Sequence, residues 1–316
     1  MIVAKCPVRV SLVGGSSDLQ SFLEVHGRGA VISLPCSLYT YIGIHENHRG
    51  RYIIDYSSHE EADKVSQIKN DIVREVFDRF EPKNYLTVSF NSDIFSVGSG
   101  LAASSSYVIT MIKAMTTYLG LHMAEFDICK LALELERKFN PLTGQQDPYG
   151  CGMPGFKKIS FHHEDDPTFE YLDSSFLDQF DVYMLYTGIV RNSTNVLKSI
   201  PVNKSKSILS LVDVMHQAII DKDSDMFLEI INEGWQKKKT TSRLIMANDK
   251  LIEIDSMLSR NEQVLAHKLC GAGGGGHFVV FTSKGSSLGA SSVFGKLSQR
   301  LTKVMLSASG IQSRVI

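Results

Sequence analysis

The sequence has no excess of charge of either sign and no long apolar run. Its 316 residues include 33 Lys and Arg against 34 Asp and Glu, for a formal net charge of -1, so the overall charge gives no reason to expect a nucleic-acid or membrane partner. No apolar run approaches the ~18 residues that span a bilayer, and residues 1–10 lack the apolar segment of a signal peptide. We therefore expect a cytoplasmic protein that holds any anionic ligand by local contacts.

Cysteine is also scarce, and its spacing is not that of a disulfide framework or a zinc site. The number of cysteines is odd, they are far apart in the chain, and none forms a C-x-x-C pair. We expect reduced thiols at all five positions, which are Cys6, Cys36, Cys129, Cys151 and Cys270.

The residues that are present are typical of a folded protein with a sizeable core. Hydrophobic residues make up 43% of the chain and charged residues 21%. At roughly 150 residues per domain, the length favours two domains. The sharpest polar break is His163–Pro167, so we predict an N-terminal domain at 1–166 and a C-terminal domain at 167–316.

The hydrophobic periodicity predicts a mixture of strands and helices in both halves. Helices are expected over Lys64–Phe80, around Val108–Met115 up to a left-handed cap at Gly120, around Ile128–Leu135, and in three stretches between 196 and 260. A loop rich in Gly and Pro is expected over Asn140–Gly155. Strands are expected at Val8–Val13, Leu38–His45, Arg51–Tyr56, Tyr85–Phe90, Lys157–His162, Val182–Tyr186 and Phe278–Phe281.

The segment Gly98–Ser106 reads G-S-G-L-A-A-S-S-S and leads into a helix. Glycines let backbone N–H groups approach phosphate oxygens, and a helix N-terminus adds favourable partial charge, so this segment can cradle phosphates. A serine N-cap beside flexible glycines is the alternative. A dinucleotide-binding G-x-G-x-x-A turn is a weaker alternative, because Asn91–Asp93 separates the loop from the preceding strand.

Three motifs in the same order along the chain resemble those of the GHMP kinases. They are Pro7–Asp18 (PVRVSLVGGSSD), the loop Gly98–Ser106 (GSGLAASSS), and Lys268–His277 (KLCGAGGGGH). Ser96 and Val97 replace the family's proline region, and Ala102-Ala103 replaces its common Gly-Ser or Gly-Thr, which leaves nucleotide preference open. The resemblance implies an α+β fold with a ribosomal S5-like N-terminal domain and a ferredoxin-like C-terminal domain. It also implies an ATP- and Mg²⁺-dependent kinase with its active site between the domains.

The resemblance assigns the nucleotide and the metal to specific residues. The ATP phosphates would lie against Gly98, Ser99, Gly100, Leu101, Ala102, Ala103, Ser104 and Ser105. Ser104 and Glu136 would be the ligands of Mg²⁺, which prefers hard oxygen donors. The alternative for Glu136, at the edge of an apolar helix stripe, is a carboxylate satisfied by a neighbouring Arg or by the backbone.

Asp147 matches the family's catalytic aspartate and would be the general base that takes the proton of a substrate hydroxyl. Arg9 would keep Asp147 ionised and stabilise the transferring phosphoryl group. The alternative for Asp147 is a turn-forming residue before Pro148.

The resemblance also places the sugar substrate. Asp18 would accept hydrogen bonds from sugar hydroxyls, although a helix N-cap before Leu19 is a serious alternative. Arg191 would bind a substrate phosphate, or would be a surface residue. The remaining substrate contacts would come from Gly14, Gly15, Ser16, Gly144, Gln146, Gly273 and Gly274, with a merely flexible connection as the alternative for the last two.

Within the family, the chain is most similar to enzymes that phosphorylate the anomeric hydroxyl of D-glycero-D-manno-heptose 7-phosphate. The alternatives are another sugar, such as fucose or galactose, or a catalytically silent sugar-sensing relative. We expect a small-molecule partner, neither nucleic acid nor membrane, and the sequence leaves a homodimer open. Two features are expected to be without function: Lys237–Lys239 as a solvated helix face, and the adjacent pair His162 and His163.

Overall fold

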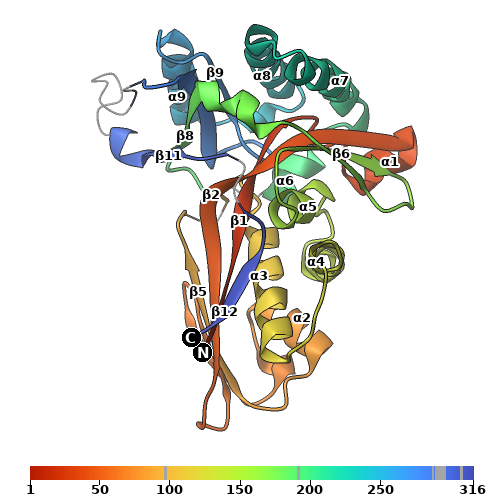
Figure 1. Ribbon diagram of the computed structural model, residues 1–316, viewed down its shortest axis with the longest axis vertical. Coiled ribbons are helices and arrows are strands. Elements are labelled where there is room, and N and C mark those ends of the chain that lie inside the picture. The colour runs from red at the N-terminus through yellow and green to blue at the C-terminus, as the bar shows by residue number, and fades with distance from the viewer. Residues whose placement is uncertain (96–97, 191–192, 287, 289–296, 307–308) are drawn as a thin grey trace.

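The computed structural model describes residues 1–95, 98–190, 193–286, 288, 297–306 and 309–316, and within them the chain forms two sheets with helices packed against both (Figure 1). The larger, eight-stranded sheet has the order β12-β1-β2-β5-β3-β4, with β6 paired to β2 and β7 to β6. The smaller sheet has the order β11-β8-β10-β9. The strands are β1 (Ile2–Val13), β2 (Arg28–Glu46), β3 (Tyr52–Asp55), β4 (His59–Ala62), β5 (Leu86–Ser92), β6 (Lys157–His162), β7 (Thr168–Tyr171), β8 (Phe180–Tyr186), β9 (Ala266–Leu269), β10 (His277–Ser283), β11 (Leu301–Val304) and β12 (Gln312–Val315).

The helices fall into two groups. One group covers a face of the larger sheet, and the other lies beside the smaller sheet (Figure 1). The helices are α1 (Gln20–His26), α2 (Asp71–Phe80), α3 (Ala103–Tyr118), α4 (Glu125–Phe139), α5 (Gln146–Gly152), α6 (Ser193–Lys198), α7 (Lys206–Ile220), α8 (Ser224–Lys239) and α9 (Asp249–Arg260). Short 3₁₀ helices lie at Val65–Gln67, Ser174–Gln179, Val202–Ser205 and Arg243–Met246.

Strands β1 and β2 are long and extend from one group of helices to the other (Figure 1). Strand β1 is buried along almost its whole length because both of its faces are covered. The first part of β2 pairs with β6, and its second part pairs with β5. The β1–β2 register shifts between Pro7 and Arg9 and again between Ser11 and Val13. Such bulges redirect side chains, and here they lie where β1 meets the cleft described below.

The two sheets share a hydrophobic core. Val8, Val10 and Leu12 of β1 belong to the same buried cluster as Val182 of β8 and Phe281 of β10. A second cluster lies between the larger sheet and helices α2, α3 and α4, and a third lies between the smaller sheet and α9. The α+β fold that the sequence predicts is therefore confirmed, and the structure shows that it is built on two sheets.

Most predicted elements are present, but two are wrong in detail. The predicted helix Lys64–Phe80 begins only at Asp71, because the side chain of Asn70 caps it by accepting a hydrogen bond from the N–H of Val73 (3.1 Å). The predicted loop Asn140–Gly155 contains α5, whose first turn accommodates Pro148 since an N–H is not needed there. The left-handed cap at Gly120 is confirmed by its φ of 67°.

Pairing within the sheets crosses the predicted domain boundary. Strand β7 follows the polar break and pairs with β6 of the larger sheet, and β12 at the end of the chain pairs with β1. The division into 1–166 and 167–316 stays a prediction about domains, but the larger sheet includes strands from both sides of it. Among the described residues, no helix is long and apolar enough to cross a membrane.

Candidate active site

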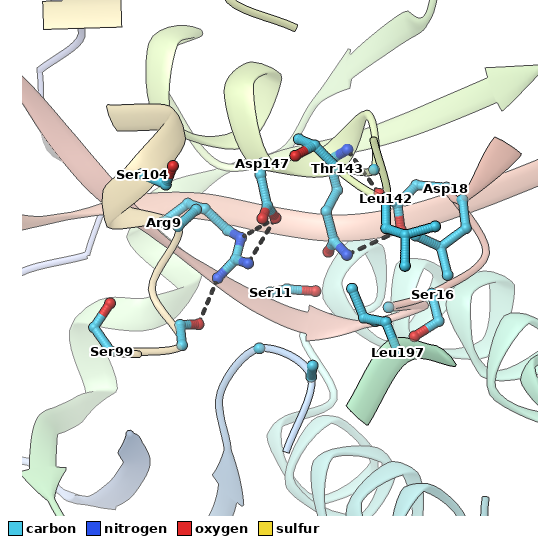
Figure 2. Close-up of a pocket in the computed structure, with 18 of the residues that line it drawn as sticks. Arg9, Ser11, Ser16, Asp18, Ser99, Ser104, Leu142, Thr143, Asp147 and Leu197 are labelled. Carbon is cyan, nitrogen blue, oxygen red and sulfur yellow. Dashed lines mark hydrogen bonds and ion pairs between the residues drawn. The ribbon is translucent and has the colours of Figure 1, made fainter. Parts of the chain in front are cut away.

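A cleft of about 160 Å³ is lined by residues of β1, of the glycine loop before α3 and of the segment before α5. Residues near the C-terminal ends of α6 and α8 also line it. Figure 2 shows its arrangement. Arg9 and Asp147 occupy the middle, Ser99 and Ser104 lie on one side of them, and Ser16 and Asp18 lie on the other. The cleft therefore has a phosphate-loop side and a second polar side, separated by one ion pair.

The central ion pair joins residues 138 positions apart in the chain. The Nε and one terminal nitrogen of Arg9 donate to Oδ1 of Asp147 at 3.2 and 2.7 Å, and the other terminal nitrogen donates to the carbonyl of Gly100 at 2.9 Å. Burial is the largest influence on the pKa of Arg9 and acts to lower it, but the charge and hydrogen bonds of Asp147, together with the nearby Cys151 and Cys270, leave that pKa raised. Arg9 is 2% exposed, whereas 30% of the Asp147 side chain is exposed, so the carboxylate faces the cleft. Asp147 lies in the first turn of α5, so the turn-forming alternative is wrong.

The glycine loop lies against the cleft as the sequence predicts, with two exceptions. Gly98, Ser99, Gly100, Ala102, Ala103 and Ser104 line it. Leu101 is instead fully buried, and its carbonyl accepts a hydrogen bond from the N–H of Arg9 (3.1 Å). Ser105 is also buried, and its hydroxyl donates to Glu136. Leu101 and Ser105 therefore hold the loop in place and do not line the cleft.

His277 of the third motif bonds the glycine loop at Ser99 and holds it in place. The N–H and Nδ1 of His277 lie 3.0 and 2.9 Å from the carbonyl of Ser99, and since a carbonyl can only accept, Nδ1 carries the proton. Burial lowers the pKa of His277, which favours this neutral form. Gly276 adopts a φ of 91°, and a Cβ there would lie 2.4 Å from the same Ser99 oxygen. Only glycine fits at that position.

Glu136 lines the phosphate side of the cleft and is 2% exposed. Burial raises its pKa to about 7, opposed by hydrogen bonds from Ser105 and Ser104 and reinforced by the charge of Asp147. No neighbouring arginine pairs with it in the described part of the chain, and its hydrogen-bond partners are instead the hydroxyls of Ser105 and Ser104. Its role as a metal ligand stays a prediction.

The oxygen donors on this side fit Mg²⁺. Glu136, the Ser104 hydroxyl and the nearby Asp147 offer only hard oxygens, and a cation would relieve the cost of burying Glu136 as an anion. Within the described residues, no cluster of three or more His, Cys, Asp or Glu could hold a metal ion. This is compatible with Mg²⁺, which keeps several waters and takes most other ligands from substrate phosphates.

Asp18 is fully buried and ties the first motif to the start of α5. Its Oδ2 accepts from the N–H of Gln146 and its Oδ1 from Nε2 of the same residue, both at 2.9 Å. A Cβ at Gly144 would lie 2.0 Å from Oδ2, so this contact requires glycine. Helix α1 is capped at Leu19 without any side-chain hydrogen bond, so the N-cap alternative for Asp18 is wrong. Burial and then the charge of Asp147 raise the pKa of Asp18 to about 6.

Some of the remaining predicted substrate residues line the cleft and others do not. Gly15 and Ser16 line the cleft together with Asp18, Gly144 and Gln146. Gly14 does not line it: a Cβ there would meet the carbonyl of Ala30 at 2.0 Å, so Gly14 serves close packing. In the third motif Gly271 and Ala272 line the cleft, whereas Gly273 and Gly274 do not. Arg191 lies outside the described residues.

Sequence reasoning missed two lysines of the cleft. Lys268 donates to the carbonyls of Ser11 (2.9 Å) and Leu12 (2.7 Å), and burial lowers its pKa to about 8. Lys238 of α8 lines the cleft and contacts the carbonyl of Gly271, and Lys239 pairs with the largely buried Asp255 at 2.9 Å. The interpretation of Lys237–Lys239 as a merely solvated face is therefore wrong for these two residues. Lys268 opens the third motif, which could have identified it, but no local pattern distinguishes Lys238 from its neighbours.

Three buried polar atoms on residues that line the cleft have no hydrogen-bond partner among the described residues. They are Oγ of Ser11, Oγ1 of Thr143 and Oε1 of Gln146. Buried polar atoms are nearly always satisfied in native proteins. All three residues lie beside one cleft, which is compatible with a ligand that carries several hydroxyl groups, each able to donate and accept.

The comparisons with known proteins agree with this chemistry. Residues 68–155 match the family described as "GHMP kinases N terminal domain". Over 306 residues the chain is 28% identical to a D-glycero-alpha-D-manno-heptose 7-phosphate kinase of Campylobacter jejuni, a match covering 89% of each chain.

Solved structures show the same fold. A D-glycero-D-manno-heptose 1-phosphate kinase from Bacteroides thetaiotaomicron superposes with a TM-score of 0.79 at 20% identity, covering 100% of this chain and 99% of that one. A galactokinase from Lactococcus lactis, complexed with galactose, superposes with a TM-score of 0.78 at 12% identity, covering 98% and 95%. Similar folds thus occur in proteins named for different sugars.

Proposed function

Since the chain belongs to the GHMP kinase family and is an ATP-dependent sugar kinase, we propose that its acceptor is a sugar that already carries a phosphate. D-glycero-D-manno-heptose 7-phosphate, phosphorylated on its anomeric hydroxyl, is the first candidate, supported by the heptose kinase of Campylobacter jejuni. The observation that carries the proposal is that two lysines, Lys238 and Lys268, line the cleft. The same cleft is lined by residues whose polar side-chain atoms lack a hydrogen-bond partner among the described residues and could bind sugar hydroxyls.

The central ion pair supports the chemical step. The anomeric hydroxyl would lie against Oδ2 of Asp147, the oxygen that Arg9 does not bond. Asp147 would take its proton as the sugar oxygen bonds to the γ-phosphorus and the bond from that phosphorus to the β-phosphate oxygen breaks. The buried guanidinium of Arg9 keeps Asp147 in place and carries positive charge beside the transferring group. Placement between the two sides of the cleft suits an in-line transfer.

The phosphate side would hold ATP and Mg²⁺. The glycine loop and the start of α3 supply backbone donors for the phosphates. Glu136 and Ser104 would hold Mg²⁺, which, when bound, neutralises charge on the β- and γ-phosphate oxygens. The clamp of His277 on the carbonyl of Ser99 keeps the loop in one shape before the nucleotide arrives.

The opposite side would hold the sugar. Asp18 and Gln146 are fixed to each other, so Oε1 of Gln146 is presented to the cleft in one orientation. Ser11 and Thr143 add oxygens that can bond neighbouring sugar hydroxyls. The acceptor phosphate would then lie toward Lys238, where a dianion gains charge-assisted hydrogen bonds. Arg191 stays a proposed further contact.

The test compares ATP consumption with heptose, heptose 7-phosphate, heptose 1-phosphate, mannose 6-phosphate, galactose and fucose, with phosphorus NMR to locate the new phosphate. The names of the two heptose kinases place the acceptor phosphate at different carbons, so both positions are included. We expect a phosphorylated heptose to have the highest kcat/KM. A higher value for galactose or fucose would refute the phosphorylated acceptor, and no turnover with any sugar would favour the silent relative.

A matched pair of variants tests the role of Lys238. Lys238→Met removes a cleft cation, whereas Lys237→Met removes a neighbour whose ammonium pairs with Glu233 at 2.7 Å on the helix surface. We expect Lys238→Met to raise KM for the phosphorylated sugar at least tenfold and Lys237→Met to leave it within twofold. Equal effects of the two variants, or an effect of Lys238→Met on KM for ATP alone, would contradict the assignment.

A further inference from the structure

A second cavity, of about 360 Å³, lies between α7 and the surface formed by β2, β6 and β7. It shares no lining residue with the active-site cleft. Its volume lies within the ~300–1,000 Å³ typical of small-molecule sites. Figure 1 shows α7 beside the ends of β2 and β6, away from α2, α3 and α4.

Basic side chains outnumber acidic ones around this cavity. Of its twelve lining residues four are basic, namely Arg28, Lys158, His162 and Lys206, whereas Asp213 is the one acidic residue that lines it among the described residues. Ser160, Thr168 and Ser210 add hydroxyl groups. The chain as a whole is almost neutral, so this is a local concentration of positive charge with hydrogen-bond donors, which is the chemistry that recognises phosphate esters.

The cavity is bridged by ion pairs between the sheet and the helix. Nζ of Lys158 on β6 lies 2.7 Å from Oδ1 of Asp213 on α7, and Nε2 of His216 on α7 lies 2.8 Å from Glu170 on β7. Asp213 is largely exposed, with 79% of its side chain accessible. The Lys158 side chain is 16% exposed, but an ion pair with so exposed a carboxylate lies near the ~0–1 kcal/mol of surface pairs. An arriving phosphate can therefore replace Asp213 as the partner of Lys158.

We propose that this cavity is a second ligand site, which binds a small phosphate ester through Arg28, Lys158 and Lys206 and thereby changes the affinity of the active-site cleft for the sugar. The carbon skeleton of the ester would lie against the apolar floor formed by Leu209 and Val212. The neighbouring hydroxyl groups would bind its polar substituents. The proposal concerns a site separate from the cleft, so it does not depend on which sugar is the acceptor.

The two sites share a wall on the sugar side of the cleft. Gly29 and Ala30 line the second cavity. The hydroxyl of Ser17 bonds both the N–H (3.1 Å) and the carbonyl (3.0 Å) of Ala30, and a Cβ at Gly29 would lie 1.9 Å from the carbonyl of Ser17. Ser17 directly precedes Asp18, which holds Gln146. A shift of this strand end therefore reaches the sugar-binding residues without passing through the nucleotide loop.

Helix α7 makes a second connection. Ile208 lines the active-site cleft, whereas Leu209, Ser210 and Val212 line the second cavity. Val212 also lies against Gly14, where a Cβ would be 2.8 Å from its Cγ2. Tightly packed interfaces transmit small displacements. An occupant that draws α7 toward β6 would therefore also move the residues beside Asp18.

Binding is tested by calorimetry with fructose 1,6-bisphosphate and, separately, inorganic phosphate, on protein saturated with a non-hydrolysable ATP analogue. Saturation removes the phosphate loop as a competing site. The test variant is Arg28→Ala/Lys206→Ala, since both side chains are exposed and the fold should tolerate their loss. Arg49→Ala/Lys83→Ala is the matched control, because it removes two exposed cations elsewhere on the surface.

We expect the bisphosphate to bind the wild type and the control alike and the test variant at least tenfold more weakly. Lys238→Met should leave this binding unchanged. Absence of binding to the wild type, equal weakening in both double variants, or loss of binding in Lys238→Met would each overturn the second site.

Regulation is tested by steady-state kinetics, with ATP and Mg²⁺ in place of the non-hydrolysable analogue. The bisphosphate should change KM for the sugar at least twofold in the wild type, with KM for ATP changed less, and should have no effect on the Arg28→Ala/Lys206→Ala variant. An equal effect on both proteins would place the ligand in the active-site cleft and overturn the proposal. Binding without any change in KM would overturn its regulatory half.

Discussion

Replacing Gly276 by alanine tests whether the third motif holds the nucleotide loop. A Cβ at this position would lie 2.4 Å from the carbonyl oxygen of Ser99 and 2.8 Å from that of Gly98. Both distances are too short for a carbon–oxygen contact, and the obstacle is backbone, so the loop must move away. Moving Ser99 breaks its two hydrogen bonds from His277, of 3.0 and 2.9 Å.

The size of the effect follows from these contacts. Two hydrogen bonds of about 1 kcal/mol each amount to about 2 kcal/mol of lost loop organisation, and about 2 kcal/mol corresponds to a roughly 30-fold loss of ATP affinity. Alanine at a φ of 91° adds a conformational cost of ~1–2 kcal/mol, which lowers the free energy of unfolding but does not act on ATP directly.

Gly285→Ala is the matched control. Gly285 has a φ of 81°, yet a Cβ there would meet no atom within 4 Å, so it carries the conformational cost without the collision. ATP affinity is measured by calorimetry and the melting temperature by scanning fluorimetry. We expect both variants to melt below the wild type and only Gly276→Ala to lose ATP affinity. Equal ATP affinities in the two variants would refute the clamp.

The other predictions concern the acidic residues. Asp147→Asn should lower kcat by two or more orders of magnitude, since a general base contributes about 10²–10⁴-fold, while ATP still binds in calorimetry; near-normal turnover would exclude it as the base. Ser104→Ala and Glu136→Gln should each raise the Mg²⁺ concentration needed for half-maximal rate, and unchanged titrations would move the metal site elsewhere. Burial raises the pKa of Glu136 to about 7, so wild-type activity should fall as the pH drops below 7. The midpoint of this fall should move to lower pH as the Mg²⁺ concentration is increased, and a midpoint that does not depend on Mg²⁺ would argue against Glu136 as a metal ligand. Burial acts to raise the pKa of Asp255, but hydrogen bonds from His267, Trp235 and Lys239 lower it to about 2; against an unfolded value of about 3.9 this contributes about 2 kcal/mol of stability above pH 4 that is lost toward pH 2. The difference in melting temperature between wild type and Asp255→Asn should therefore shrink over that range, and a constant difference would contradict the lowered pKa.

The family and the local chemistry of the site could be predicted from the sequence because they depend on short segments. The run of glycine and serine before α3 forms a phosphate-binding loop through its own backbone, whatever surrounds it. The helix end at Gly120 likewise follows from one left-handed residue. The reaction type followed from the order of three motifs, and the roles of individual site residues stay predictions.

Sequence reasoning failed where residues far apart decide the outcome. Helix α5 lies in a segment rich in Gly and Pro that has little helical propensity, and its place beside β1 and Asp18 stabilises it there. Lys238 is one of three consecutive lysines, and only the rotation of α8 decides which of them enters the cleft.

The sequence by itself therefore determined which chemical groups this protein has and how each short segment folds, since backbone conformation and capping act over a few residues. The tertiary structure alone decided which groups meet. It brings Arg9 to Asp147 across 138 positions, returns β12 to pair with β1, and gathers Arg28, Lys158 and Lys206 around a second cavity. These outcomes depend on strand register and on packing between distant elements, which no local pattern encodes.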